Sequence, residues 1–260
     1  MKVKLLLICL IILCSCNRDI NSCDNCKTMI GKLFFEVNKI EWGEVCIGKD
    51  YENIVRVYNP THKDISMKIF TRLPELCVVK FGSDSLDCAS KEVVLSALAC
   101  DTLRFIFMPR DTSLIGDYSK GVFLEIDGEV YMKPIEMRAE VLENFDSLTS
   151  KELLSAPTID VEKDTFSFGT ITVNEKVTIP VKITNKGKRN LIIRKVETDC
   201  TCTAAIIGNR IVGINDSVIL KIVFRPMGRY GRQYKTIRLY CNDPHRPVIK
   251  LIIHGDVAVN

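Results

Sequence analysis

The stretch VTIPVKITN, residues 177–185, decides the fold class because apolar and polar residues alternate along it. A period of two is typical of a β-strand with one buried face. Similar alternating runs occupy residues 218–224 and 237–241, and the turn-forming sequences NKGK, GIND and NDPHRP separate the runs. About seven short strands in roughly 100 residues, with no amphipathic helix, predict an antiparallel β-sandwich.

The same pattern occurs twice in the chain. Trp42-Gly43 and Asn59 correspond to Phe168-Gly169 and Asn185, and both pairs are 126 residues apart. Later motifs follow in the same order at offsets of 115 to 117 residues, which one insertion in the first copy accounts for. The sequence therefore predicts an all-β protein made of two tandem Ig-like sandwiches.

The N-terminal stretch MKVKLLLICLIILCSC has a basic tip and an apolar run from Leu5 to Leu13. That run is too short to span a bilayer and is typical of a secretion signal. Leu13 to Cys16 (LCSC) resembles a bacterial lipobox, which implies cleavage before Cys16 and acylation of its thiol. The alternative is ordinary cleavage and release. Because Asn17 and not Asp follows the cysteine, the resemblance favours the outer over the inner membrane.

These features divide the 260 residues, of which 47% are hydrophobic and 26% charged, into five parts. The predicted parts are a signal peptide at 1–15, a lipid-anchored tether at 16–30, a first sandwich at 31–143, a linker at 144–157 and a second sandwich at 158–260.

The second copy resembles a known family through four short motifs. They are the aromatic-Gly pair at Phe168, N-x-G at Asn185 to Gly187, C-x-C-T at Cys200 to Thr203, and Asn242-Asp243. This pattern is similar to the bacterial Ig-like domain of unknown function 1573, common in exported lipoproteins. The resemblance covers residues 158–260, and the first copy is degenerate, with LPELCVV in place of the cysteine pair. The family has no established activity, so the resemblance implies a fold and a location only.

No catalytic sequence motif is visible. The chain lacks a nucleophile elbow, a Walker loop, a zincin motif and an EF-hand loop. Its histidines, His62, His245 and His254, are scattered, which favours surface or strand roles over metal binding. We therefore expect no enzyme, no cofactor and no resident metal. An exported, anchored chain is also not expected to bind nucleic acid.

Cys200 and Cys202 form the candidate thiol site. On an extended strand, residues i and i+2 lie roughly 6.6 Å apart on one face, whereas a disulfide needs Cβ atoms about 3.8 Å apart. A metal could bridge such a pair, but two thiolates fill only half of a tetrahedral site. The spacing favours simple packing near Arg229 and Arg232, at the pole facing away from the first domain. A disulfide or redox pair, and a metal clamp, remain alternatives.

Two further cysteine patterns bear on an exported chain, in which disulfides form. A two-residue hairpin loop at Gly82-Ser83 would pair Cys77 with Cys88, so we predict a Cys77–Cys88 bridge. Cys23-x-x-Cys26 lies in the tether, and for it a local disulfide or no role is favoured over redox or metal chemistry.

Charge is divided unevenly between the halves. Residues 157–260 hold 17 Lys and Arg against 9 Asp and Glu, whereas residues 17–156 hold 17 against 23. Opposite net charges favour contact between the domains. The stretch RPMGRYGRQYK concentrates the cations Arg225, Arg229, Arg232 and Lys235. It is either a solvated basic hairpin or a site for an anion, such as a lipid phosphate, an acidic glycan or a partner's carboxylate.

The sequence thus favours a lipid-anchored cell-envelope module that binds or supports other components. Its partner would be an envelope protein or an anionic glycan or lipid at the distal pole of the second domain. The alternative is a thiol-dependent redox or metal-handling protein that uses Cys200 and Cys202.

Overall fold

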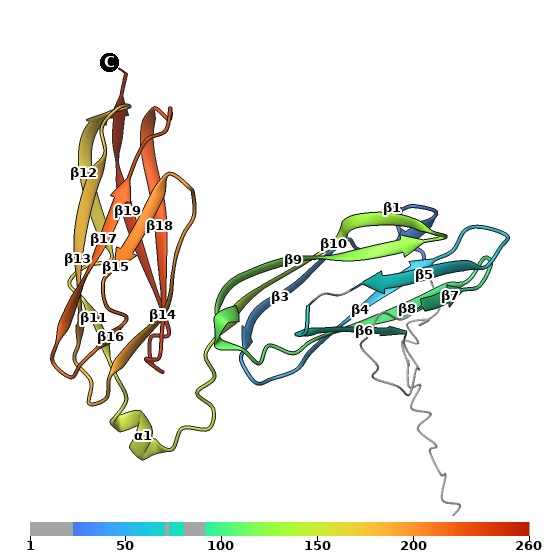
Figure 1. Ribbon diagram of the computed structural model, residues 1–260, viewed down its shortest axis with the longest axis horizontal. Helices are drawn as coiled ribbons and strands as arrows, with labels where there is room; N and C mark the ends of the chain where they lie inside the picture. The colour runs from blue at the N-terminus through green and yellow to red at the C-terminus, as the bar shows by residue number, and fades with distance from the viewer. Residues whose placement is uncertain (1–22, 71–72, 81–91, 260) are drawn as a thin grey trace, which may run out of the picture.

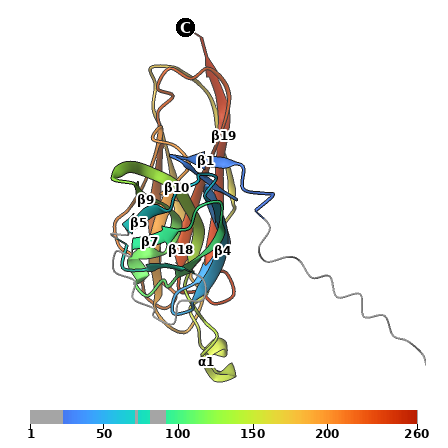
Figure 2. The same ribbon diagram turned by 90° about the vertical axis from the view of Figure 1, so that its right-hand side faces the viewer.

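The computed structural model describes residues 23–70, 73–80 and 92–259, which form two β-domains joined by a linker with one short helix (Figure 1). The predicted signal peptide, Cys16 and Cys88 lie outside the described residues. In both views the C-terminal end of the second domain lies opposite the helix (Figures 1 and 2).

The first domain packs two sheets face to face. One has the strand order β1-β2-β4-β8-β6 and the other β3-β10-β9-β5-β7. The strands are β1 (Thr28–Ile30), β2 (Leu33–Phe35), β3 (Lys39–Cys46), β4 (Tyr51–Tyr58), β5 (Ile65–Phe70), β6 (Leu76–Lys80), β7 (Glu92–Leu95), β8 (Cys100–Phe107), β9 (Gly116–Ile126) and β10 (Glu129–Leu142). A 3-10 turn, η1 (Thr112–Leu114), lies between β8 and β9.

The second domain has sheets of order β11-β13-β17-β15 and β12-β19-β18-β14-β16. The strands are β11 (Ile159–Val161), β12 (Thr165–Thr172), β13 (Val177–Asn185), β14 (Leu191–Thr198), β15 (Thr203–Ile207), β16 (Ile211–Val212), β17 (Ser217–Phe224), β18 (Gly231–Cys241) and β19 (Val248–Ala258). Helix α1 (Ser150–Leu154) lies in the predicted linker and starts with a capping box between Thr149 and Glu152.

The two domains share one topology, as the repeat predicts. Apart from β1, each strand of the first domain has a counterpart at the same place in a sheet of the second domain. Strands β14 and β18 are antiparallel neighbours. In each domain, however, one pair is parallel, β3 with β10 and β12 with β19. The prediction of purely antiparallel sheets is corrected at these pairs. The early strand, β3 or β12, lies at the edge of its sheet beside the last strand, β10 or β19, and both run in the same direction.

The aromatic-Gly motif marks a β-bulge on that early strand. The register shifts at Gly43 and at Gly169, where φ is +68° and +70°. Glycine adopts a positive φ without the steric cost that a Cβ brings. The aromatic ring before each glycine packs on the core at nearly the same distance in both domains. The ring centroids of Trp42 and Phe107 are 5.2 Å apart, and those of Phe168 and Phe224 are 5.1 Å apart.

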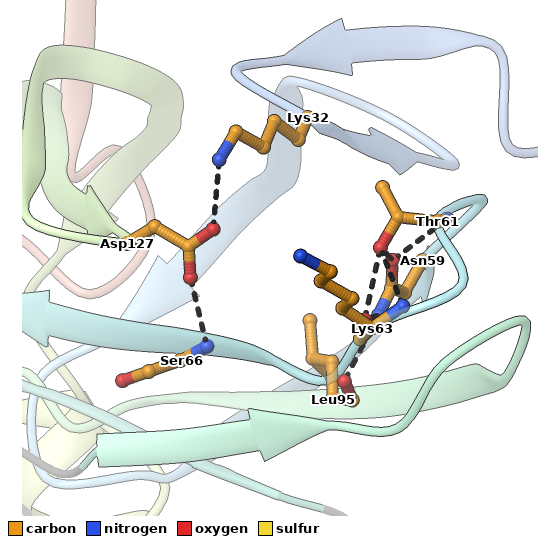
Figure 3. A network of polar contacts seen from close by, with 7 residues as sticks. All are labelled: Lys32, Asn59, Thr61, Lys63, Ser66, Leu95 and Asp127. Carbon is orange, nitrogen blue, oxygen red and sulfur yellow. Dashed lines mark hydrogen bonds and ion pairs between the residues drawn. The ribbon is translucent and has the colours of Figure 1, made fainter.

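A buried asparagine ties two loops of the first domain together, as Figure 3 shows for Asn59. Its amide nitrogen donates to the carbonyl oxygens of Lys63 (2.8 Å), Leu95 (3.0 Å) and Ser96 (3.1 Å). Its amide oxygen accepts from the backbone N–H and the hydroxyl of Thr61, at 3.0 and 2.8 Å. All four hydrogen-bonding positions of the amide are thus occupied in a fully buried site.

Asn185 repeats this arrangement in the second domain. Its amide nitrogen donates to the carbonyl oxygens of Arg189 (2.8 Å), Val212 (3.0 Å) and Gly213 (3.2 Å), and its oxygen accepts from the Gly187 N–H at 2.9 Å. A Cβ on Gly187 would lie 2.4 Å from the carbonyl oxygen of Ala156 in the linker. The N-x-G motif therefore has a structural role in holding the loops of the second domain together.

The first domain begins earlier than predicted. Thr28–Ile30, assigned to the tether, is strand β1 and pairs with β2. Cys23 forms a disulfide with Cys100 at the start of β8, with Cα atoms 5.8 Å apart, and Cys26 is free. The expectation of a local bridge within Cys23-x-x-Cys26 is therefore wrong. The bond instead fastens the chain before β1 to the sandwich.

Candidate functional site

The second domain is held against the first by polar contacts on the outer face of β14 and β18. Arg194 binds Glu143 through two hydrogen bonds of 2.8 and 2.7 Å. Tyr240 is only 1% exposed, and its hydroxyl donates to Glu140 at 2.9 Å. Burial and the nearby Glu140 carboxylate raise the pKa of Tyr240 above its usual value, so it remains a neutral donor.

Asp117 completes this interface from strand β9. Its carboxylate accepts from Arg238 at 2.7 Å, and its backbone N–H donates to the Glu197 carboxylate at 3.1 Å. The preceding Gly116 has a φ of +106°, and a Cβ there would lie 2.6 Å from Glu197 Oε1. Glu143 and Asp117 of the first domain thus meet the basic Arg194 and Arg238 of the second, which is the direction that the charge split predicts. The Asp117 N–H meets an acidic group, Glu197.

Cys200 and Cys202 are joined by a disulfide, with Cα atoms 5.2 Å apart. The favoured prediction of two unbridged cysteines is therefore wrong. The prediction took the strand as extended through the motif, but β14 ends at Thr198 and β15 starts at Thr203, so the intervening turn brings the sulfurs together. Cys202 is 2% exposed and belongs to the core, whereas Cys200 is half-buried.

Thr203 lies beside both sulfurs. Its hydroxyl oxygen is 3.5 Å from Cys200 Sγ and 3.7 Å from Cys202 Sγ, and the residue is 4% exposed. The turn is closed by a hydrogen bond from the Thr203 N–H to the Cys200 carbonyl oxygen at 3.2 Å. A second bond, from the Thr198 hydroxyl to the same oxygen at 3.2 Å, ties the turn to β14. The C-x-C-T motif is therefore a bridged turn with a hydroxyl directed at the bridge.

The basic loop between β17 and β18 adjoins this turn. The contact comes from Arg225, whose backbone N–H donates to the Cys202 carbonyl oxygen at 2.9 Å. The proximity of the pair to Arg229 and Arg232 stays a prediction. Cys200 lies three residues beyond Glu197, which contacts the first domain.

The tip of the basic loop is a tight turn. Pro226 O accepts from the Arg229 N–H at 3.1 Å, and the two central residues, Met227 and Gly228, have φ of +51° and +79°. Positive φ at both positions is the geometry of a type I′ hairpin turn, which favours Asn-Gly. Met227 and Tyr230 are 62% and 51% exposed.

The charges of this loop are largely unpaired. Arg232 lies 4.0 Å from Asp256. Among the described residues, Arg225, Arg229 and Lys235 form no ion pair. The buried Gln233 supports the loop from below through a 3.0 Å bond to the Tyr230 carbonyl oxygen. The arrangement gives a hydrogen-bonded, basic tip with one exposed apolar side chain and one exposed aromatic side chain.

Two of the free thiols, those of Cys241 and Cys26, are poorly suited to nucleophilic chemistry. Cys241 is buried in the core, and burial raises its pKa to about 12. Burial, and next the Glu36 carboxylate, raise the pKa of Cys26 to about 11. Cys77 is not a free thiol, because it is buried in β6 and disulfide-bonded. Its predicted partner Cys88 lies outside the described residues.

Two absences concern only the part of the chain that the structure describes. No cluster of three or more His, Cys, Asp or Glu side chains there could hold a metal ion. No helix there is long and apolar enough to cross a membrane.

His254 stacks on the exposed Tyr234 with ring centroids 5.9 Å apart.

A comparison with family models gives a match in the second domain. Residues 159–257 match the family described as "Protein of unknown function (DUF1573)". The remaining Asn-Asp motif of that domain is structural, because the buried Asp243 accepts from the Ile159 N–H at 2.9 Å. No curated protein matches the chain.

Among the solved structures, one match shows the same fold, and two others are similar only at lower TM-scores. A protein of unknown function from Porphyromonas gingivalis W83 is 16% identical over 87% of this chain and 100% of its own, with a TM-score of 0.61. The ASH/PapD-like domain 7 of human CEP192 is 15% identical, covering 44% of this chain and 87% of its own, with a TM-score of 0.32. The Pseudomonas aeruginosa CupB2 chaperone is 10% identical, covering 84% and 98%, with a TM-score of 0.27.

Proposed function

We propose that the chain is an exported, lipid-anchored module of the cell envelope with no catalytic activity of its own. In this proposal Cys16 carries the lipid, the first domain acts as a spacer, and the second domain presents its distal pole to an anionic partner. The partner is an envelope protein with exposed carboxylates or an anionic glycan or lipid.

The basic loop carries this proposal. Residues 225–235 contain four cations and no acidic residue, and the loop lies at the end of the domain far from the linker helix (Figure 1). Its backbone is closed by hydrogen bonds, so less of the main chain needs to be ordered on binding. A partner with complementary charge would be attracted at long range and then held by short contacts.

The interdomain contacts support a presenting role. Paired charges on Arg194 and Arg238 and the buried Tyr240 hold the second domain at a defined angle to the first. A lipid at the N-terminus would therefore place the loop at a fixed distance from the membrane surface rather than on a freely jointed arm.

Two basic loops at opposite ends of the second domain allow a charge-matched test. One variant reverses Arg225, Arg229 and Arg232 to Glu, and the other reverses the exposed Lys186, Lys188 and Arg189. A photo-reactive residue at position 230 is expected to give a cross-linked adduct in intact producing cells. The adduct should be lost in the first variant and retained in the second. Absence of an adduct, or equal loss in both variants, would contradict the proposal.

The anchor is tested separately. Cys16→Ser should yield a chain that no longer partitions into detergent and whose N-terminal peptide lacks the mass of the lipid. If both properties are unchanged by the substitution, the lipoprotein hypothesis is wrong.

A further inference from the structure

The Cys200–Cys202 disulfide constrains the chain very little. Disulfides stabilise proteins mainly by restricting the unfolded state, and the effect grows with the length of chain that they close. Cys23 and Cys100 are 77 residues apart, whereas Cys200 and Cys202 are two residues apart. The long bridge therefore has an evident structural purpose, and the short one requires a different explanation.

The first domain builds the same turn without a bridge. The Leu76 N–H donates to the Leu73 carbonyl oxygen at 3.0 Å, as the Thr203 N–H does to Cys200. The Met108 N–H donates to the Glu75 carbonyl oxygen at 2.7 Å, as the Arg225 N–H does to Cys202. Leu73 and Glu75 thus occupy the places of the two cysteines. The backbone of this turn does not depend on a disulfide.

The two sulfurs differ in how a reagent could reach them. Cys200 is half-buried, whereas Cys202 is 2% exposed and packs in the core. An attacking thiolate must approach in line with the disulfide, so attack at Cys200 leaves Cys202 as the departing sulfur. Thr203 Oγ1 lies 3.7 Å from that departing sulfur and can donate a hydrogen bond to it. The site thus has one sulfur on a partly exposed residue, a sheltered leaving group and a donor for the charge that develops.

We propose that Cys200–Cys202 is a thiol–disulfide exchange site that accepts two electrons from a dithiol. One thiolate of the dithiol bonds to Cys200 Sγ, the bond between Cys200 and Cys202 breaks, and Cys202 leaves as a thiolate that takes up a proton. The second thiol of the dithiol then loses its proton and displaces Cys200 from the mixed disulfide. The dithiol ends as a disulfide, and Cys200 and Cys202 end as two thiols.

This inference goes beyond the binding role and does not depend on it. The exchange is stoichiometric, with one bridge per chain, and it involves neither the cations of the basic loop nor the anchor. The backbone bonds of Cys200 and Cys202 are retained when the bridge opens, since they are made by carbonyl oxygens. The reduced and oxidised forms should therefore share one fold.

The experiment is a titration of the full mature chain with dithiothreitol, followed by alkylation and peptide mass mapping. The Cys23–Cys100 disulfide is the internal control. We expect Cys200 and Cys202 to be alkylated at a dithiol concentration at least tenfold below that needed for Cys23 and Cys100. The circular dichroism spectrum should not change at that point. Reduction of both pairs at one concentration, or unfolding of the second domain on reduction, would overturn the proposal.

Two variants test the hydroxyl. Thr203→Val keeps the shape of the side chain and should slow reduction of the bridge about tenfold, because a hydrogen bond to a developing charge is lost. Thr203→Ser keeps the hydroxyl and should retain most of the rate. Neither substitution should change the rate at which the Cys23–Cys100 bridge is reduced. Equal rates in Thr203→Val and the unaltered chain would exclude Thr203 as the positioning residue.

Discussion

The same turn in the two domains is filled by different chemistry. In the first domain the buried carboxyl of Glu75 accepts a 2.8 Å hydrogen bond from the Tyr118 hydroxyl. In the second domain Cys202 takes the place of Glu75 and forms a disulfide with Cys200. Because both turns close the same backbone hydrogen bonds, the side chains at these positions are not dictated by the fold.

Other features are the same in both domains. The bulge at Gly43 and Gly169, the ring beside it and the buried Asn59 or Asn185 recur with nearly identical geometry. Residues that recur in this way maintain the sandwich. The features that differ between the domains are the Cys200–Cys202 bridge and the basic loop. Because the sandwich forms without them in the first domain, they are available for function. The comparison separates the two sets without any alignment of relatives.

The largest expected effect comes from removing one disulfide from each domain. Cys23→Ser with Cys100→Ser should lower the free energy of unfolding of the first domain by about 4 kcal/mol, and Cys200→Ser with Cys202→Ser should lower that of the second by roughly 1.5 kcal/mol. Guanidinium unfolding followed by Trp42 fluorescence reports on the first domain, since Trp42 is the single tryptophan. Circular dichroism follows both domains. Equal losses in the two domains would break the contrast between a structural and a non-structural bridge.

The buried asparagines should be equally important in both domains. Asn59→Ala and Asn185→Ala each leave several carbonyl oxygens without a donor, which should cost about 3 kcal/mol in free energy of unfolding. Asn174→Ala, at an exposed position, serves as the control and should change stability by less than about 0.5 kcal/mol. A much smaller loss of stability at one of the two asparagines would mean that this residue is not needed to maintain the sandwich of its domain.

The interface should contribute less than either core feature. Glu143→Gln and Arg194→Gln, combined in a double-mutant cycle, should give a coupling of about 1 kcal/mol, because the pair is bidentate and partly buried. The hydrogen bond to Glu143 raises the pKa of Arg194, which is consistent with a stabilised charge. Small-angle scattering should show a wider distribution of domain angles in each single variant and at high salt. A coupling near zero would leave the domains independently mobile.

Local patterns predicted most of the fold. The period of two and the offset of 126 residues located β3, β4, β12 and β13, because half-buried strands must alternate and repeated domains keep their spacing. The parallel pairs were not predictable in this way. Periodicity identifies a strand but contains no information about the direction of its neighbour. The Cys23–Cys100 bond was missed for a similar reason, since nothing in the sequence near residue 23 refers to residue 100.

The candidate site was predicted in position but not in bonding. The spacing argument for Cys200 and Cys202 assumed an extended backbone, and the turn between Thr198 and Thr203 invalidates that assumption. One signal was available: LPELCVV stands at the equivalent place in the first copy, and Pro74 there is typical of a turn. The contacts of Asp117 and Tyr240 could not be predicted, because charged and polar surface residues follow no period.

The smallest expected effect tests whether the tip of the basic loop is shaped for function. Met227 has a φ of +51°, which costs free energy in any residue with a long side chain, whereas Asn tolerates it. The corresponding connection of the first domain, residues 108–115, contains no residue with positive φ. Met227→Asn should therefore raise the free energy of unfolding by about 0.5 kcal/mol while reducing formation of the cross-link at position 230.

Asn215 offers the matched control for that substitution. It already occupies a turn at a φ of +59°, in the same domain and away from the basic loop. Asn215→Met should destabilise the domain by a similar amount and leave the cross-link at position 230 unchanged. Opposite changes in stability, with loss of the adduct only at Met227, would show that an unfavourable backbone position is retained for the sake of an exposed methionine. If Met227→Asn instead destabilises the domain, the side chain contributes to packing, and the loop would then belong with the residues that maintain the sandwich.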